Sequence, residues 1–220
     1  MAKWVYVLAA LAFGVKMVVV PHPSFESPLA VVAAVVQDSG IPNTVSAIIL
    51  RNRLYDTVCE VVVFTIAIMG VQKLMANERP LRRIYQLTDA PSVVLAQLGA
   101  TIAAMVGVEL ALRGHLSPGG GFAAGVAGGT AIGLIAMTSS PELLQRIYQR
   151  WHIPTWEKVV VLVFIVLSVL TLTGWEPPQG ELGALVSGGM IPVLNVLVAV
   201  KVMLGSWGMV LVFIRYRGLL

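Results

Sequence analysis

Two ionisable side chains lie within apolar stretches that are long enough to cross a bilayer. Glu60 belongs to the stretch 56–75, and Lys201 lies near the middle of the stretch 190–213. A charged side chain in hydrocarbon costs roughly 2.5–3.5 kcal/mol on insertion scales unless it pairs, reaches water or changes its protonation state. Because proton relays and cation-exchange sites use such groups, we expect Glu60 and Lys201 to take part in proton or cation exchange.

Lys201 has the more demanding position, because it is too far from either end of its stretch for the ammonium to snorkel to water. It needs a carboxylate partner, a water-filled cavity or the loss of its proton. A structural role, in which Lys201 pairs with a neighbouring subunit, is the alternative. Asn195 precedes it on the same stretch, about 120° away round a helix, and need not share its pocket.

Three carboxylates lie near the ends of apolar stretches. Glu60 is just over one turn inside its stretch, so a simpler alternative is that it reaches water at the interface. Asp56 precedes Glu60 by four residues and shares its helix face. Glu109 and Arg113 have the spacing of a helix ion pair, which predicts an interfacial salt bridge.

The composition excludes a soluble protein. Hydrophobic residues make up 57% of the 220 residues and charged residues only 12%, against about 25% charged in an average soluble domain. A soluble chain of this size cannot hide so much apolar surface. The single cysteine, Cys59, provides neither an internal disulfide nor a metal cluster. No nucleophile–base pattern is present, and we expect neither an enzyme nor a cofactor.

The elements that must position these residues are membrane-spanning helices, so the expected fold is an all-α, polytopic membrane protein. A spanning helix needs about 20 mostly apolar residues. The stretches that meet this requirement are 4–20, 56–75, 91–112, 121–138, 156–174 and 190–213.

The basic residues between these stretches predict the orientation. With the N-terminus in the cytoplasm, the inner side receives Lys3, Lys73, Arg79, Arg82, Arg83, Arg146, Arg150, Lys158, Arg215 and Arg217. The outer side receives only Arg51, Arg53 and Arg113. Because Lys and Arg collect on the cytoplasmic side, we expect a cell-membrane protein with both termini in the cytoplasm, and its net charge of +4 does not indicate a nucleic-acid partner.

Two segments allow alternative interpretations. Residues 1–20 resemble a signal peptide, but Lys16 interrupts the apolar run and no cleavage site precedes Pro21. Segment 29–55 is broken by polar residues within 37–43, and neither half is long enough to span. We expect two short helices at the outer face or a re-entrant pair, and a tilted, broken seventh span is the alternative.

Glycines recur every fourth residue at Gly121, Gly125, Gly129 and Gly133. Small residues at this spacing let a second helix approach closely, so the pattern predicts tight packing of the stretch 121–138. The run 119–121 is not a phosphate-binding loop, because no Lys-Ser/Thr follows it.

Two motifs resemble the MnhB (MrpB) family, one of the membrane subunits of the Mrp-type sodium/proton antiporters. Residues 113–122, RGHLSPGGGF, are similar to its GH-x-x-PGGGF signature, and residues 187–195, SGGMIPVLN, are similar to its SGGxIPxLN motif. Lys201 matches the lysine motif that follows, and the resemblance covers about residues 90–215. The signature residues that it implies to be structural are Gly114, Pro118, Gly119, Gly120, Gly121, Phe122 and Asn195.

The front of the chain resembles the C-terminal part of the large subunit of the same antiporters. The similarity covers residues 38–50, DSGIPNTVSAIIL, and continues to Glu60. The chain therefore resembles a fusion, with a membrane region similar to the large subunit at 1–80 and an MnhB-like domain at 81–220. It departs from the family at Arg51, where an acidic residue is usual, and at Glu109, where tyrosine is usual.

The resemblance implies one membrane component of a multi-subunit Mrp-type antiporter, which exchanges Na⁺ and protons alongside other membrane subunits in the lipid bilayer. The residues that it implies for ion translocation are Glu60, Lys201, Asp56 and His115. Glu109, which stands where the family usually has tyrosine, is a further candidate for ion translocation peculiar to this chain, and a harmless interfacial substitution is the alternative. One alternative is the related sodium-translocating module of a membrane-bound hydrogenase or sulfane reductase, in which partner subunits carry the redox chemistry. Another is a scaffold that only holds subunits together.

Overall fold

The computed structural model describes residues 2–19, 28–81 and 84–218, and every regular element in these ranges is helical. The chain divides into two compact units, Met1–Ala34 and Val35–Leu220. The predicted all-α fold is therefore confirmed. Arg82, Arg83 and the segment around Pro21, which entered the sequence argument, lie outside the described residues.

The first unit contains α1, Ala2–Val19, which covers most of the predicted span 4–20. A helix of these 18 residues is about 27 Å long, close to the roughly 30 Å of the hydrocarbon core. Its exposed side chains include Leu11 and Phe13. The insertion of this helix into the membrane stays a prediction.

The segment 29–55 folds as separate short helices, as its polar interruption predicts. They are α2, Pro28–Ser39, α3, Thr44–Ala47, and a π-helical turn η1, Ile48–Asn52. The chain turns at Gly40, whose φ of +68° is in the left-handed region that favours glycine. Asn43 caps α3 by accepting hydrogen bonds from the backbone N–H groups of Val45 and Ser46. Neither half of the segment has the length of a span.

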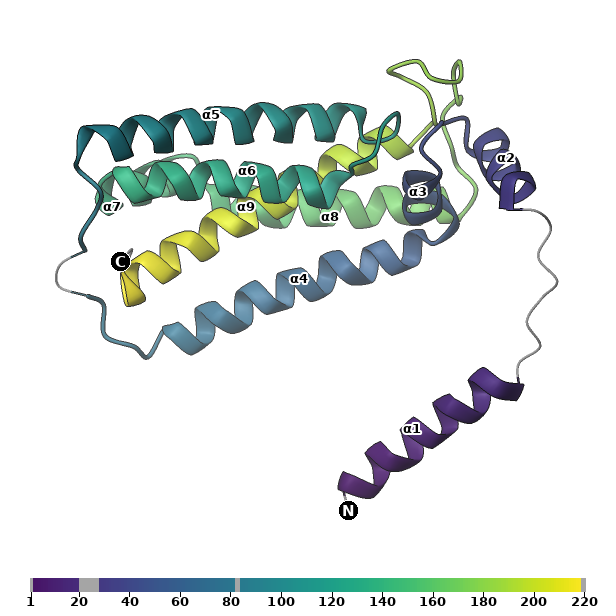
Figure 1. Ribbon diagram of the computed structural model, residues 1–220, viewed down its shortest axis with the longest axis horizontal. Helices are drawn as coiled ribbons and strands as arrows, with labels where there is room; N and C mark the ends of the chain where they lie inside the picture. Colours follow the sequence, from purple (N-terminus) through teal and green to yellow (C-terminus); the bar gives the residue numbers. More distant parts are fainter. Residues whose placement is uncertain (1, 20–27, 82–83, 219–220) are drawn as a thin grey trace. The chain divides into compact units, whose positions relative to one another are not determined.

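Five helices of the described residues are long and apolar enough to cross a membrane. They are α4, Leu54–Met75, α5, Ala90–Arg113, α6, Gly121–Thr138, α8, Ile153–Leu172, and α9, Ile191–Arg217. These helices correspond to the last five predicted stretches. A short amphipathic helix, α7, Pro141–Arg150, connects α6 to α8 (Figure 1).

Helix α9 is the central element of the second unit. Half of its apolar window is buried, against a third or less in the other four long helices. It contacts α4, α5, α6 and α8, which run alongside it (Figure 1). Its fully buried residues include Leu194, Val198 and Val202. A polar side chain that points inward from α9 is therefore removed from both lipid and water.

The glycine strip of α6 packs against α9, which confirms the predicted close approach. A Cβ atom at Gly121 would lie 2.5 Å from the carbonyl oxygen of Asn195, and one at Gly129 would lie 2.6 Å from Cβ of Ser206. A Cβ at Gly125 would overlap Val202. Gly133 has open space, so three of the four glycines meet the neighbouring helix. The packing partner belongs to the same chain.

Candidate functional site

A buried ion pair lies in the core of the second unit. Lys201 of α9 is fully buried, and its Nζ atom lies 3.8 Å from Oε1 of Glu157 on α8. The same ammonium lies over the ring of Phe64 on α4, 4.0 Å from the ring centroid. Three helices thus meet around one positive charge.

The ammonium of Lys201 is almost completely removed from the protein surface. The side chain of Lys201 is 1% exposed and that of Glu157 is 12% exposed. At 3.8 Å the two groups attract but do not form a direct hydrogen bond, and Lys201 Nζ has no hydrogen-bond partner in the described part of the chain. Removing one member of such a pair leaves a buried charge without compensation. Of the alternatives that its depth allows, Lys201 therefore has a carboxylate partner.

Glu157 was not predicted as a site residue. The predicted span 156–174 placed it at the membrane boundary, whereas α8 begins at Ile153 and Glu157 lies one turn inside. Pro154 could have indicated this start, because proline is common in the first turn of a helix. It places the expected first residue of the helix near 153, before the predicted boundary at 156. With that start, Glu157 becomes a carboxylate inside the apolar run.

Two glycines of α9 allow polar groups to approach the pair. A Cβ at Gly205 would lie 3.2 Å from Oε1 of Glu157, and one at Gly208 would lie 2.9 Å from the hydroxyl of Tyr148. The side chain of Gln72 lies near the same point, with Nε2 3.7 Å from that position. A line of polar groups thus runs along α9, from the pair toward α7.

A cavity of about 430 Å³ contacts these groups between α4, α7 and α8. Its polar lining is formed by Thr65, Gln72, Tyr148, Glu157 and Lys158. Burial raises the pKa of the Tyr148 hydroxyl, and the negative charge of Glu157 raises it further. The cavity therefore reaches the Glu157 side of the buried ion pair.

The signature loop and the second motif come together at the other end of α9. Asn195 donates hydrogen bonds from Nδ2 to the carbonyl oxygens of Leu110, at 3.2 Å, and Ala111, at 2.7 Å. It thereby satisfies carbonyl groups at the end of α5. A Cβ at Gly114 would lie 2.8 Å from this Nδ2 atom, so glycine is needed there. The two motifs form one structural cluster.

The signature loop encloses His115, which is fully buried. Both ring nitrogens lack hydrogen-bond partners within the described residues. Burial lowers the pKa of His115, and the nearby backbone of Ala184 and Leu185 opposes this shift in part. A neutral imidazole is therefore favoured in the folded protein.

A smaller cavity of about 230 Å³ lies under the same loop. Its lining includes Ser46, Thr57, Phe122, Asn195 and the glycine run 119–121. Among the signature residues, Gly121 and Asn195 are buried, Phe122 is half-buried, and Pro118 and Gly119 are exposed. The loop therefore forms one wall of a cavity whose lining is mostly apolar, with Ser46, Thr57 and Asn195 as its polar side chains.

The other candidate carboxylates form no ion pair with Lys201. Glu60 lies on an exposed part of α4, although it is inside the span. Asp56 pairs with Arg53. Glu109 pairs with Arg113 at 3.0 Å, and both side chains are more than half exposed, so the predicted helix salt bridge is confirmed. Of the five predicted ionisable residues, only Lys201 and His115 are fully buried.

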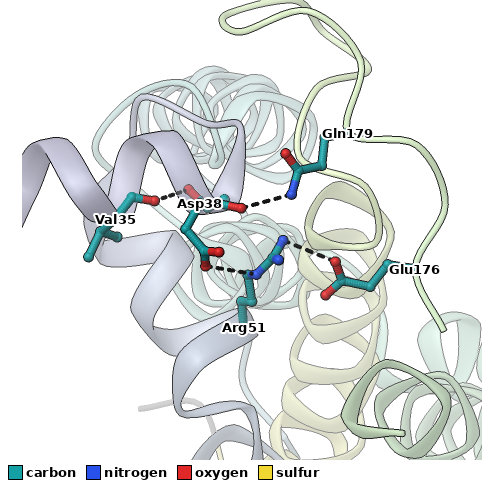
Figure 2. A network of polar contacts seen from close by, with 6 residues as sticks. Val35, Asp38, Arg51, Glu176 and Gln179 are labelled. Atoms are coloured by element: carbon teal, nitrogen blue, oxygen red, sulfur yellow. Dashed lines mark hydrogen bonds and ion pairs between the residues drawn. The ribbon is translucent and has the colours of Figure 1, made fainter. Parts of the chain in front are cut away.

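Arg51 lies at the centre of a second charge cluster (Figure 2). Its guanidinium lies 3.3 Å from Asp38 and 3.0 Å from Glu176. Gln179 donates a hydrogen bond to the carbonyl oxygen of Asp38 at 2.8 Å. Arg51 therefore joins the end of α2 to the segment between α8 and α9. This contact was not predicted.

Residues 91–208 match the family described as a domain related to the MnhB subunit of Na⁺/H⁺ antiporters. No curated protein matches the chain.

Two solved structures share the fold. A chain of the membrane-bound sulfane sulfur reductase, an archaeal respiratory membrane complex, has a TM-score of 0.65 at 22% identity, over 98% of this chain and 99% of that chain. A chain of the Mrp complex from Dietzia sp. DQ12-45-1b has a TM-score of 0.61 at 18% identity. That match covers 99% of this chain and 25% of the Dietzia chain.

Proposed function

The chain belongs to the family defined by a domain related to the MnhB subunit of Na⁺/H⁺ antiporters, and from this membership we propose that it is one membrane subunit of a multi-subunit Mrp-type cation/proton antiporter. The matched residues, 91–208, include both Glu157 and Lys201. The long apolar helices suit a multi-pass membrane subunit. The distribution of Lys and Arg supports an orientation with both termini in the cytoplasm.

The buried pair of Lys201 and Glu157 is the observation that carries the proposal. A lysine at this depth needs the nearby carboxylate, and a proton that passes from the ammonium to the carboxylate converts the ion pair into two neutral groups. Both states are tolerable in a low-dielectric core, because neither leaves a single uncompensated charge. The pair can therefore exchange protons with its surroundings.

Glu60 has a different place in this proposal. Its side chain lies on an exposed part of α4, at a depth where lipid contact is costly for a carboxylate. A neighbouring subunit that covers this part of α4 would remove the cost and bring the carboxylate into a shared ion path. Asp56, four residues earlier, is closer to the end of the helix.

The alternative function is the corresponding subunit of a redox-coupled membrane complex. The match to a chain of the archaeal sulfane sulfur reductase over nearly the full length of both chains favours it. Purification of the intact complex and identification of its subunits separates the two functions. Hydrogenase or oxidoreductase subunits in the complex would support the redox-coupled alternative.

Sodium-dependent proton flux in vesicles that contain the intact complex tests the proposed role of the pair. We expect Lys201→Ala and Glu157→Gln to reduce flux strongly while the complex still assembles. Lys201→Arg should restore little of the flux that Lys201→Ala loses, because a guanidinium does not release its proton. Glu142→Gln, on the exposed surface of α7, is the matched control and should leave flux unchanged. Normal flux and assembly in both pair variants would support the scaffold interpretation instead.

A further inference from the structure

We propose that an anionic phospholipid binds in the groove between α4 and α8, with an acyl chain along the two helices and its phosphate beside Lys158. The groove is the cavity of about 430 Å³ that contacts Glu157. This inference goes beyond ion exchange, because it assigns a binding site for a single lipid molecule of the surrounding membrane.

The lining of the groove suits a hydrocarbon chain. Its more buried apolar side chains are Ile68 of α4 and Val161 and Ile165 of α8. Met69 of α4 and Leu162 of α8, which are 61% and 63% exposed, line it closer to the surface. An apolar surface of this kind on a membrane helix pair is filled most favourably by another apolar group, and an acyl chain is one.

Polar side chains with hydrogen-bond donors collect at one end of the groove. They are Gln72 in the last turn of α4, Tyr148 of α7 and Lys158 in the second turn of α8. Lys158 is exposed and forms no ion pair within the described part of the chain. Glu157 also lines the groove, but its carboxylate faces the ammonium of Lys201 at 3.8 Å. The free ammonium at this end therefore favours an anionic group such as a phosphate.

Exposed tryptophans place this end of the groove at the level of the lipid headgroups. Trp151, between α7 and α8, is 67% exposed, and Trp156, in the first turn of α8, is 58% exposed. Tryptophan is enriched where the hydrocarbon core meets the headgroups. Lys158 lies about 3 Å beyond Trp156 along the helix axis, so its long side chain can reach a phosphate at that level.

The opposite end of α8 agrees with this depth. Trp175, which follows the helix, is 56% exposed. The 20 residues of α8 are about 30 Å long, which is the thickness of the hydrocarbon core. The groove therefore extends from one headgroup region into the hydrocarbon, as a phospholipid does.

The charges around the polar end suit an anionic lipid. Lys73 follows Gln72 in the last turn of α4 and is exposed. Helix α7 has two exposed arginines, Arg146 and Arg150, and one exposed carboxylate, Glu142. In the orientation proposed above this end faces the cytoplasm, and the cytoplasmic leaflet carries the anionic lipids that basic residues attract.

A helix of a neighbouring subunit is the alternative occupant of the groove. Such a helix would have to cover Lys158 and Gln72 with acceptors of its own, because buried donors without partners are costly. A phospholipid supplies the phosphate acceptors and the apolar chain in one molecule. The bound chain also covers the groove side of Glu157, the member of the buried ion pair that keeps 12% exposure.

Native mass spectrometry of the purified full chain in a neutral detergent tests the headgroup contact. The probes are dioleoyl phosphatidylglycerol, which is anionic, and dioleoyl phosphatidylcholine, which has the same chains and no net charge. We expect the chain to retain phosphatidylglycerol in preference. Lys158→Gln should lower this retention about fivefold, the contribution of one basic residue near an anionic membrane surface, and leave phosphatidylcholine unaffected. Lys16→Gln, which removes an exposed lysine of α1, is the matched control and should change neither.

A pair of tryptophan variants tests the acyl-chain contact. Leu162→Trp fills the groove and should lower the retention of both lipids. Val163→Trp adds the same bulk at the next residue, which is exposed and does not line the groove, and should leave retention unchanged. Because Lys158 is exposed, Lys158→Gln keeps the fold, and the test does not depend on tolerance of the tryptophans.

Equal loss of phosphatidylglycerol in Lys158→Gln and Lys16→Gln would show a general effect of charge and overturn the proposal. Unchanged retention in a folded Leu162→Trp would do the same. In the assembled complex, the absence of phosphatidylglycerol that Leu162→Trp displaces would assign the groove to a partner helix, and that result also overturns the proposal. None of these measurements uses ion flux, so failure of the lipid site is distinguishable from failure of the proposed function.

Discussion

The side-chain amide of Asn43 donates a 2.7 Å hydrogen bond to the carbonyl oxygen of Gly114, across 71 residues of sequence. The same amide bonds the carbonyl oxygen of Ser117 at 2.7 Å, and the backbone N–H of Asn43 bonds the carbonyl oxygen of His115 at 3.3 Å. The segment around Asn43, which precedes the residues that match the MnhB family, thus binds directly to the signature loop.

Asn43→Ala should destabilise the second unit. The variant loses the cap of α3, worth about 1 kcal/mol, and leaves loop carbonyls short of donors at about 1–3 kcal/mol. We expect a clear fall in the thermal unfolding midpoint of the purified protein in detergent. Asn52→Ala, at an exposed position of the neighbouring η1 turn, is the control and should change the midpoint little. Equal midpoints for both variants would contradict the proposed role of Asn43.

The Lys201–Glu157 pair should show strong coupling in a double-mutant cycle. Glu157→Leu alone leaves the buried ammonium unpaired, and Lys201→Met alone leaves the carboxylate unpaired, so each should cost about 3–5 kcal/mol of unfolding free energy. Lys201→Met combined with Glu157→Leu should recover most of that stability, because apolar groups of similar size can replace a buried pair. The measurement is unfolding in detergent by denaturant. Additive losses in the double variant would show that the two groups do not interact.

His115 should make stability depend on pH. Because burial lowers its folded pKa below the ordinary value of about 6.5, the unfolded chain binds the proton more readily. Stability should therefore be fully present above about pH 6.5 and decline as the pH falls through the lowered folded pKa. Unfolding midpoints between pH 5 and 8 measure this. His115→Gln should weaken the decline, whereas His152→Gln, at an exposed position, should retain it.

The glycine strip provides a matched pair of packing variants on one helix. Gly125→Leu should separate α6 from α9, because even its Cβ would overlap Val202, and overpacking typically costs about 1–3 kcal/mol. Gly133→Leu should be tolerated, since nothing lies within 4 Å of a Cβ there. Yield of monodisperse protein and its unfolding midpoint report the difference. Equal tolerance of both substitutions would contradict the packing.

The predicted orientation is tested by labelling single cysteines in a Cys59→Ser background. Glu181→Cys, in the exposed segment between α8 and α9, should react with an impermeant maleimide from outside the cell. Gln149→Cys, on the exposed surface of α7, should react only after permeabilisation. The opposite pattern would place both termini outside the cytoplasm.

The spanning helices and the glycine strip were predictable from the sequence, because each depends on local properties. The length of an apolar run decides whether a helix can span, and a four-residue repeat of glycine decides that one face is smooth. The polar interruption at Gly40 similarly predicted the two short helices. That Lys201 needs a carboxylate partner, a water-filled cavity or the loss of its proton also followed from its depth alone.

Only the tertiary structure decided which partners these groups have. The rotation of each helix, set by packing against its neighbours, turns Lys201 toward Glu157 and leaves Glu60 on an exposed surface. A carboxylate near a span boundary looks alike in sequence whether it faces the core or the outside, so Glu157 was missed and Glu60 was favoured. The contacts of Asn43 and Asn195 with the signature loop join segments far apart in the chain, and no local pattern records which of those segments will meet.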